Sequence, residues 1–207
     1  HLGDAASITD GLPYNPDLGP YEIAADGRSS GVRDDMWAFT SRNPGLDLMA
    51  STMLAAASRS LKGYNDDLSE RALQQSKRLM EEATELIAKR PQDNRAWGGG
   101  PANMGTNLQL FISTGEQQYR DKFLEILWPA LDRFVSFSLL TALDAIPYMD
   151  ESYREKLRPY VVKYREYIEG LEKENPYGVP IGLGNWAGGG EVMNFGTTVC
   201  FASKYFP

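Results

Sequence analysis

The chain has 207 residues, of which 42% are hydrophobic and 24% are charged, so it can bury a sizeable core and is not a disordered protein. Its net charge of −7 argues against nucleic acid and anionic membrane surfaces as partners. The sequence offers no run of about 18 apolar residues and so predicts no membrane span.

Residues 1–44 are rich in turn-forming Gly, Pro and Asn, which predicts a long ordered loop region. Beyond it the apolar spacing becomes helical, with a cap expected at Asp47 and with Met49 and Met53 facing inward. Pro129 is expected to end or kink a helix. The predicted helices span residues 47–62, 66–90, 102–114, 117–127, 130–146, 150–173 and 191–205. We find no convincing β-strand pattern in the sequence.

Apolar and amphipathic helices alternate along residues 45–207. Such alternation is typical of two concentric layers, in which inner helices contact protein on all sides and outer helices have one wet face. The predicted fold class is therefore all-α, and an α/α toroid fits better than a four-helix bundle. We expect residues 1–207 to form a single, partial toroidal domain with 1–44 as its loop-rich N-terminal part.

Two residue types are too scarce for several kinds of chemistry. Cys200 is the one cysteine, so an intramolecular disulfide is excluded, and its neighbours Val199 and Phe201 predict a buried, inert side chain. His1 is the one histidine, which excludes a multi-histidine metal site and disfavours a Ser-His-Asp mechanism. An enzyme built on this chain would use carboxylates as its acid and base.

Two glycine-rich loops carry tryptophans, Trp97 and Trp186, and each precedes an apolar helix. Indole faces on loops without bulky side chains are suited to stacking against sugar rings, although both tryptophans could also plug the ends of the toroid. A dinucleotide-binding interpretation of the glycines at 182–187 fails because Pro180 interrupts the preceding segment and no βαβ unit surrounds it.

Charged residues form two further candidates. Arg33, Asp34 and Asp35 are consecutive and could either form a capping and ion-pair cluster or recognise sugar hydroxyl groups. Glu191, at the start of the last helix, could interact with the helix N-terminus or bind sugar as a carboxylate.

Three segments resemble glycoside hydrolase family 9. Residues 43–58 are similar to its helix PGSDvAAEtAAALAAAS, residues 108–119 to its aawLyraTgd..Y segment, and residues 175–194 to its npyGvp…WGs…n segment. This resemblance implies part of an (α/α)6 barrel from a secreted, extracellular or periplasmic β-1,4-glucanase that inverts the anomeric carbon. With a glucan as the expected ligand, the residues singled out above become candidate substrate-binding residues: Trp186, Trp97, Arg33, Asp34, Asp35 and Glu191. His1 loosely matches a substrate-contacting histidine of the family.

The chain departs from the family at the motifs that carry the family's catalytic residues. The family's Asp-Ala-Gly-Asp motif is not reproduced, because residues 3–6 lack the second aspartate, and its acid glutamate and His-Arg motif have no counterpart. We therefore expect no catalytic residue and no metal ligand in this segment. The stretch that often helps the family to bind calcium is replaced around Arg95 to Trp97, which argues against calcium, and no cofactor is expected.

Three functions remain open at this point. The leading one is a segment of a β-glucanase that supplies cleft walls for a β-glucan, with further barrel segments or a second copy covering its open edge. A non-catalytic toroid that binds carbohydrate or acts as a scaffold is the alternative. A helical domain that binds a protein partner is the third.

Overall fold

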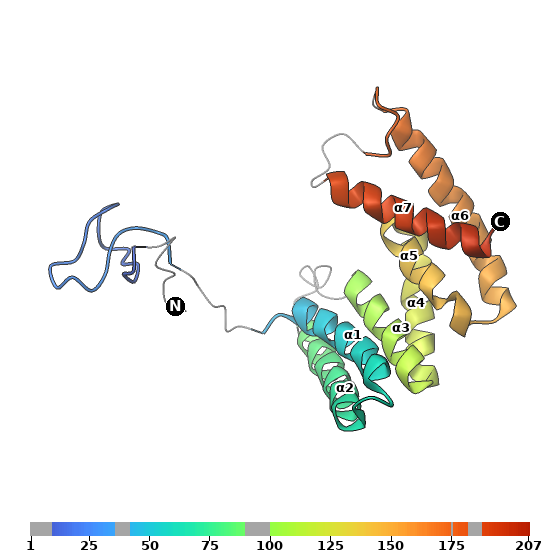
Figure 1. Ribbon diagram of the computed structural model, residues 1–207, viewed down its shortest axis with the longest axis horizontal. Coiled ribbons are helices and arrows are strands. Elements are labelled where there is room, and N and C mark those ends of the chain that lie inside the picture. The colour runs from blue at the N-terminus through green and yellow to red at the C-terminus, as the bar shows by residue number, and fades with distance from the viewer. Residues whose placement is uncertain (1–9, 36–41, 90–99, 175, 182–187) are drawn as a thin grey trace. The chain divides into compact units, whose positions relative to one another are not determined.

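A computed structural model of the protein describes residues 10–35, 42–89, 100–174, 176–181 and 188–207. The chain divides into two compact units, His1–Arg42 and Asn43–Pro207 (Figure 1).

The first unit is a loop structure within its described residues. Its described β-structure consists of two isolated β-bridges, which Ser30 makes to Tyr14 and to Ile23. The backbone of Gly31 passes so close to that of Gly19 that a Cβ on Gly31 would lie 1.9 Å from the carbonyl oxygen of Gly19. Only glycine fits this approach, so Gly31 fixes how the two segments cross.

The second unit is helical, and its helices begin near the predicted positions. They are α1 (Pro44–Leu61), α2 (Asp66–Ala88), α3 (Gly100–Thr114), α4 (Gln117–Arg133), α5 (Val135–Ala145), the 3₁₀ turn η2 (Ile146–Tyr148), α6 (Glu151–Glu172) and α7 (Gly188–Tyr205). No described segment of this unit is a strand, and the described helices include none with the length and apolar content of a membrane span.

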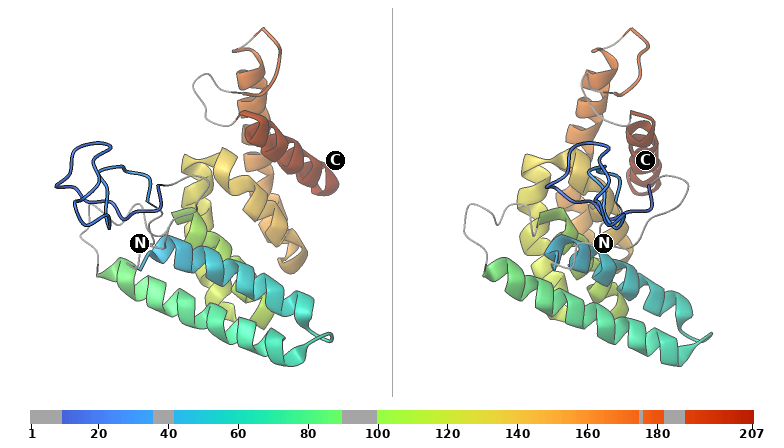
Figure 2. Two further views of the ribbon diagram at one scale, coloured as in Figure 1. Left: turned by 60° about the vertical axis from the view of Figure 1, so that its left-hand side comes forward. Right: turned by 90° about the vertical axis from the view of Figure 1, so that its left-hand side faces the viewer.

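Alternate helices pack against one another. Helix α1 contacts α3, α3 contacts α5 and α5 contacts α7, while α2, α4 and α6 pack on the helices that flank them in sequence (Figure 2). This is the expected two-layer arrangement, and the fold is an all-α segment of an α/α toroid.

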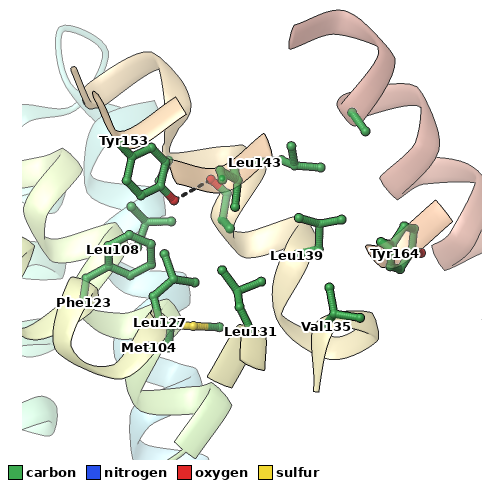
Figure 3. Close-up of a cluster of buried hydrophobic side chains, with 14 of the residues drawn as sticks. Met104, Leu108, Phe123, Leu127, Leu131, Val135, Leu139, Leu143, Tyr153 and Tyr164 are labelled. Atoms are coloured by element: carbon green, nitrogen blue, oxygen red, sulfur yellow. Dashed lines mark hydrogen bonds between the residues drawn. The ribbon is translucent and has the colours of Figure 1, made fainter. Parts of the chain in front are cut away.

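The core lies where α3, α4 and α5 meet. Leu108, Phe123, Leu127 and Leu139 are each at most 1% exposed and belong to one buried cluster (Figure 3). Helix α6 joins this core through Tyr153, whose hydroxyl donates a hydrogen bond of 2.9 Å to the carbonyl oxygen of Ala142. The apolar interior therefore continues from the third to the sixth helix.

Aromatic contacts attach α7 to α6. The ring centroid of Phe195 lies 6.2 Å from that of Tyr164 and 6.1 Å from that of Tyr167. Phe195, Thr198 and Ala202 are buried at spacings of three and four residues, so α7 presents one face to its neighbours.

Small polar residues let α1 approach α2 and α3 closely. Ser51 and Ser76 each donate a hydrogen bond of 2.7 Å to the other's carbonyl oxygen, which ties α1 to α2. Thr106 donates to the carbonyl oxygen of Leu48 at 2.9 Å, which ties α3 to α1. These short side chains therefore allow α1 to pack closely against α2 and α3.

Two predicted helix boundaries are wrong. The cap of α1 is Asn43 rather than Asp47, because the Asn43 side chain accepts the backbone N–H of Gly45 at 3.0 Å and Pro44 suits the first helical position. Pro129 lies inside α4, which continues to Arg133. A proline removes one backbone donor, and the helix survives that loss here because apolar residues are buried on both sides of it.

Three predictions of burial are wrong. Met49 is 49% exposed and Met53 is 66% exposed, because both lie on the face of α1 that no described helix covers. Cys200 is exposed, since α7 packs through one face only and the cysteine is not on it.

Candidate functional site

The structure describes three of the seven candidate binding residues in full. Arg33, Asp34 and Asp35 end the described stretch 10–35 of the first unit. Glu191 lies in the first turn of α7, and its side chain is outside what the structure describes. His1, Trp97 and Trp186 also lie outside the described residues.

The two aspartates hold a neighbouring segment of backbone. Oδ2 of Asp34 accepts the N–H of Asp10 at 2.6 Å, and Oδ2 of Asp35 accepts the N–H of Tyr14 at 2.6 Å. Ser30 in turn donates from its hydroxyl to the carboxylate of Asp10. These contacts favour the capping interpretation for both aspartates, because their carboxylates organise the loop.

Arg33 is held differently from the aspartates. Its Nε donates a hydrogen bond of 3.0 Å to the hydroxyl of Tyr14, and its guanidinium carbon lies 5.5 Å from the centre of the Tyr14 ring. No described residue accepts a hydrogen bond from its Nη1 or Nη2. The guanidinium is thus fixed at one edge and keeps donors for a ligand.

A hollow of about 350 Å³ lies beside Arg33. Its lining includes Tyr14, Pro16, Leu18, Tyr21, Val32 and Arg33. Tyr21 is 86% exposed and has a φ of 71°, a left-handed conformation that is uncommon for a residue other than glycine. Sequence reasoning missed both tyrosines, although Tyr21 directly follows the turn-forming pair Gly19-Pro20.

The second unit has a hollow of about 250 Å³ beside Arg59. Nη1 of Arg59 donates to the carbonyl oxygens of Ala55 and Gln109, at 3.3 and 3.1 Å, and to the hydroxyl of Ser113 at 2.6 Å. Nη2 donates to the side-chain oxygen of Gln109. This guanidinium is occupied in clamping α1 to α3, so we interpret it as structural.

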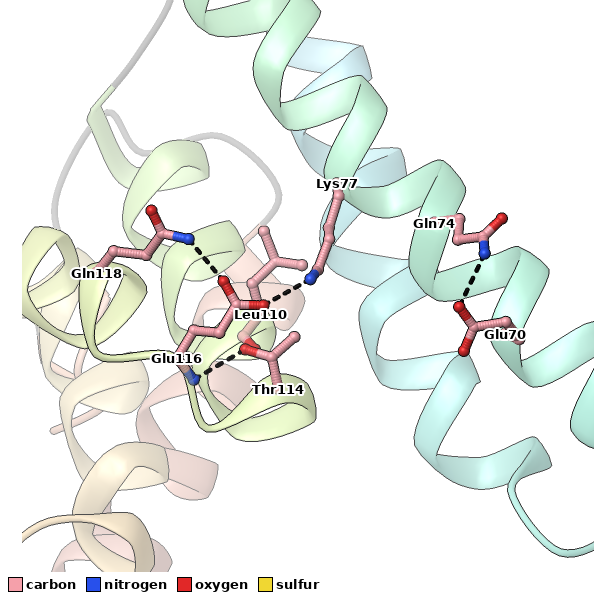
Figure 4. A network of polar contacts seen from close by, with 7 residues as sticks. All are labelled: Glu70, Gln74, Lys77, Leu110, Thr114, Glu116 and Gln118. Carbon is pink, nitrogen blue, oxygen red and sulfur yellow. Dashed lines mark hydrogen bonds and ion pairs between the residues drawn. The ribbon is translucent and has the colours of Figure 1, made fainter.

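Several carboxyl groups of the second unit have shifted pKa values, and Glu116 and Asp144 are shifted in opposite directions. The ammonium group of Lys77 lies 2.5 Å from Glu116 and, with Gln118, lowers the pKa of that carboxyl group (Figure 4). Desolvation raises the pKa of Asp144, and the charge of Arg59 opposes that rise. An inverting hydrolysis needs an acid and a base about 6.5–9.5 Å apart. The lowered pKa of Glu116 makes it unsuitable as the general acid of such a reaction, because a general acid must hold its proton near neutral pH.

Possible metal ligands are not grouped within the described residues. No cluster of three or more His, Cys, Asp or Glu side chains occurs there.

The comparisons with known proteins give one likeness in fold. A scan against family models finds no match, and a search of curated proteins finds none. Among solved structures, a metagenome-derived glycoside hydrolase family 9 endoglucanase matches 79% of this chain with a TM-score of 0.59 and 20% identity. The chain corresponds to 33% of that structure's length. At 20% identity this similarity shows only the fold. The matching structure comes from the same family that the three sequence segments resemble.

Proposed function

We propose that the chain is a segment of a glycoside hydrolase that acts on β-1,4-glucans in the manner of an inverting endoglucanase. The observation that carries the proposal is the α/α-toroid fold shared with a family 9 endoglucanase over 79% of the chain. The three sequence segments that resemble the same family support it independently, because they occur in the family's order.

In this proposal the segment binds glucan and does not cleave it. The hydrogen bonds of Asp34 and Asp35 are used to hold the loop backbone, and Glu116 is engaged with Lys77. We assign sugar stacking to Trp186 and Trp97, and hydroxyl recognition to Arg33. Asp34, Asp35, Glu191 and His1 remain candidate sugar contacts. We propose no cofactor and a secreted enzyme.

Affinity electrophoresis tests this function. Migration of the chain should be retarded in gels that contain hydroxyethyl-cellulose or xyloglucan and unaffected in gels that contain starch. Trp186→Ala should weaken the retardation by about 5- to 100-fold, the loss expected for a large aromatic contact. Tyr64→Ala is the control, because Tyr64 is 89% exposed in the turn after α1 and has no proposed role.

Each outcome of that test is informative. No retardation by any β-glucan would contradict the proposed function. A longer chain that includes the remaining barrel segments could also be retarded without hydrolysing the β-glucan. That result would favour the non-catalytic carbohydrate-binding alternative.

We also propose that a protein surface covers the open faces of α1 and α7. Each exposed large apolar side chain forgoes about 1.5–3 kcal/mol of burial, so an uncovered face is costly. The cover would be further toroid helices or a second copy of the chain. A monomer that unfolds cooperatively and hydrolyses carboxymethyl-cellulose would contradict both this proposal and the absence of catalysis. The exposed apolar side chains on these faces of α1 and α7 are those of Met49, Met53, Met193, Val199 and Phe201.

A further inference from the structure

Tyr21 occupies a position that would suit glycine better. The turn of residues 19–22 is closed by the N–H of Glu22, which donates to the carbonyl oxygen of Gly19 at 3.0 Å. Pro20 and Tyr21 are its central residues, and a positive φ at the second of these is normally supplied by glycine. A tyrosine there carries conformational strain, which persists only where the surroundings impose it.

Hydrogen bonds around Tyr21 impose its left-handed backbone conformation. Gly31 donates its N–H to the carbonyl oxygen of Glu22 at 2.8 Å, and the side chain of Glu22 accepts the N–H of Gly19 at 2.9 Å. The backbone is thus fixed on both sides of Tyr21, while the ring itself is 86% exposed at the hollow. A strained backbone that presents an uncovered aromatic ring indicates a contact surface.

The walls of the hollow indicate what would bind there. Pro16, Leu18 and Val32 give it apolar sides, and Arg33 supplies hydrogen-bond donors at one edge. Residues 10–35 contain six acidic and two basic side chains, so an anionic ligand would meet net repulsion. A neutral ligand with an apolar face and a rim of hydroxyl groups matches all three features.

The volume limits how much of such a ligand can enter. Ligand pockets occupy about 300–1,000 Å³, and this hollow lies at the small end of that range. It has room for one sugar ring rather than for several.

We propose that the hollow is a carbohydrate subsite that takes one pyranose ring of a neutral glucan, with Tyr21 against the ring face and Arg33 donating to its hydroxyl groups. Tyr14 is a positioning residue, because its hydroxyl and ring hold the guanidinium in place. The choice of a glucan rests on the proposed function. All lining residues of the subsite come from residues 14–33 of the first unit.

The test uses the whole chain and backbone amide shifts recorded during titration with cellotetraose. Amides between Tyr14 and Arg33 should shift in the unaltered protein. Tyr21→Gly should weaken that binding at least about tenfold while preserving the turn, since glycine adopts a positive φ freely. Arg33→Gln should also weaken it, and Tyr64→Ala should leave it unchanged.

The outcomes separate this proposal from the proposed function. Binding of cellotetraose with no shift between Tyr14 and Arg33, or with full affinity in Tyr21→Gly, would overturn the subsite and leave the proposed function standing. Shifts in this region with tetragalacturonate but not with cellotetraose would overturn the neutral ligand. The absence of any response to cellotetraose would overturn the subsite and, together with unretarded migration in β-glucan gels, the proposed function as well.

Discussion

The two units of the chain are stabilised by different interactions. In the described residues 10–35 the buried positions are Ser30 and Gly31, and the loop is held by carboxylates that accept backbone N–H groups. In the second unit the helices meet through fully buried apolar side chains. A loop with almost no core can therefore keep a defined shape when acidic side chains cap its backbone.

A second contrast lies within the helical unit. Helices α3 and α5 have neighbours on both sides, although α5 still exposes Phe137, whereas α1 and α7 expose several methionine, valine and phenylalanine side chains. The composition of all four helices is apolar, so the difference comes from what surrounds each helix. These contrasts can be tested by substitutions whose expected effects decrease in the order given.

The largest effect is expected from Leu127→Ala in α4. Leu127 is fully buried, and its truncation should lower the free energy of unfolding of the helical unit by about 2–5 kcal/mol. Met53→Ala, at an exposed position of α1, should change it by less than about 0.5 kcal/mol in the monomer, where the proposed cover of this face is absent. Urea unfolding followed by circular dichroism measures both. Equal losses would show that the face of α1 is covered in solution.

Tyr153→Phe should have a smaller effect in the same core. It deletes the hydroxyl that donates to Ala142 and should cost about 0.5–1.5 kcal/mol in urea unfolding. The pKa of Tyr153 is raised by burial, so the hydroxyl remains a donor throughout the usual pH range. Tyr64→Phe, in an exposed turn, serves as the control. An unchanged midpoint for Tyr153→Phe would contradict the assigned bond.

Asp34→Ala tests the loop unit. The substitution removes the acceptor for the N–H of Asp10 and should cost about 1 kcal/mol locally, which corresponds to about fivefold faster amide exchange near residue 10. Helical unfolding should be unchanged, because the second unit has its own core. Hydrogen exchange resolved by residue measures this, and a loss of helical stability of similar size would contradict separate stabilisation.

The smallest effect is expected from Glu116→Gln, and it depends on pH. The folded-state pKa of Glu116 is lowered, chiefly by the hydrogen bond from Lys77. Its contribution to stability is therefore present above the ordinary carboxyl pKa of about 4 and is lost as the pH falls through the lowered value. The melting temperatures of the variant and the unaltered chain should differ at neutral pH and converge in acid.

Glu85→Gln is the matched control for this substitution. Glu85 lies 3.7 Å from Lys89 with both side chains largely exposed, so its loss should matter less. A difference between Glu116→Gln and the unaltered chain that grows in acid would contradict the assigned ion pair.

Sequence patterns predicted the helices because a 3.6-residue period is a local property. They failed where the answer depends on neighbours. Met53 and Cys200 have apolar surroundings in the sequence, yet each lies on a helix face without a described neighbour. Pro129 was expected to end or kink a helix, but it does not end α4, because buried leucines on both sides outweigh the loss of one hydrogen bond.

The candidate site was predictable only in part. Consecutive charges drew attention to Arg33, Asp34 and Asp35, and the structure places all three in one hydrogen-bonded loop. Tyr21 was missed, because the pair Gly19-Pro20 indicates a turn but not that Tyr21 is left-handed or that it borders a hollow. These properties arise from the close approach of two segments that are distant in sequence.

The central claim is that this segment binds β-1,4-glucan without cleaving it, and proton NMR of cellohexaose mixed with the purified chain tests it most directly. The account predicts broadening of the sugar signals, which reports binding, together with no new anomeric signals after prolonged incubation. Signals from shorter oligosaccharides would contradict the absence of catalysis. Sharp and unshifted cellohexaose signals at a high concentration of the chain would contradict glucan binding itself.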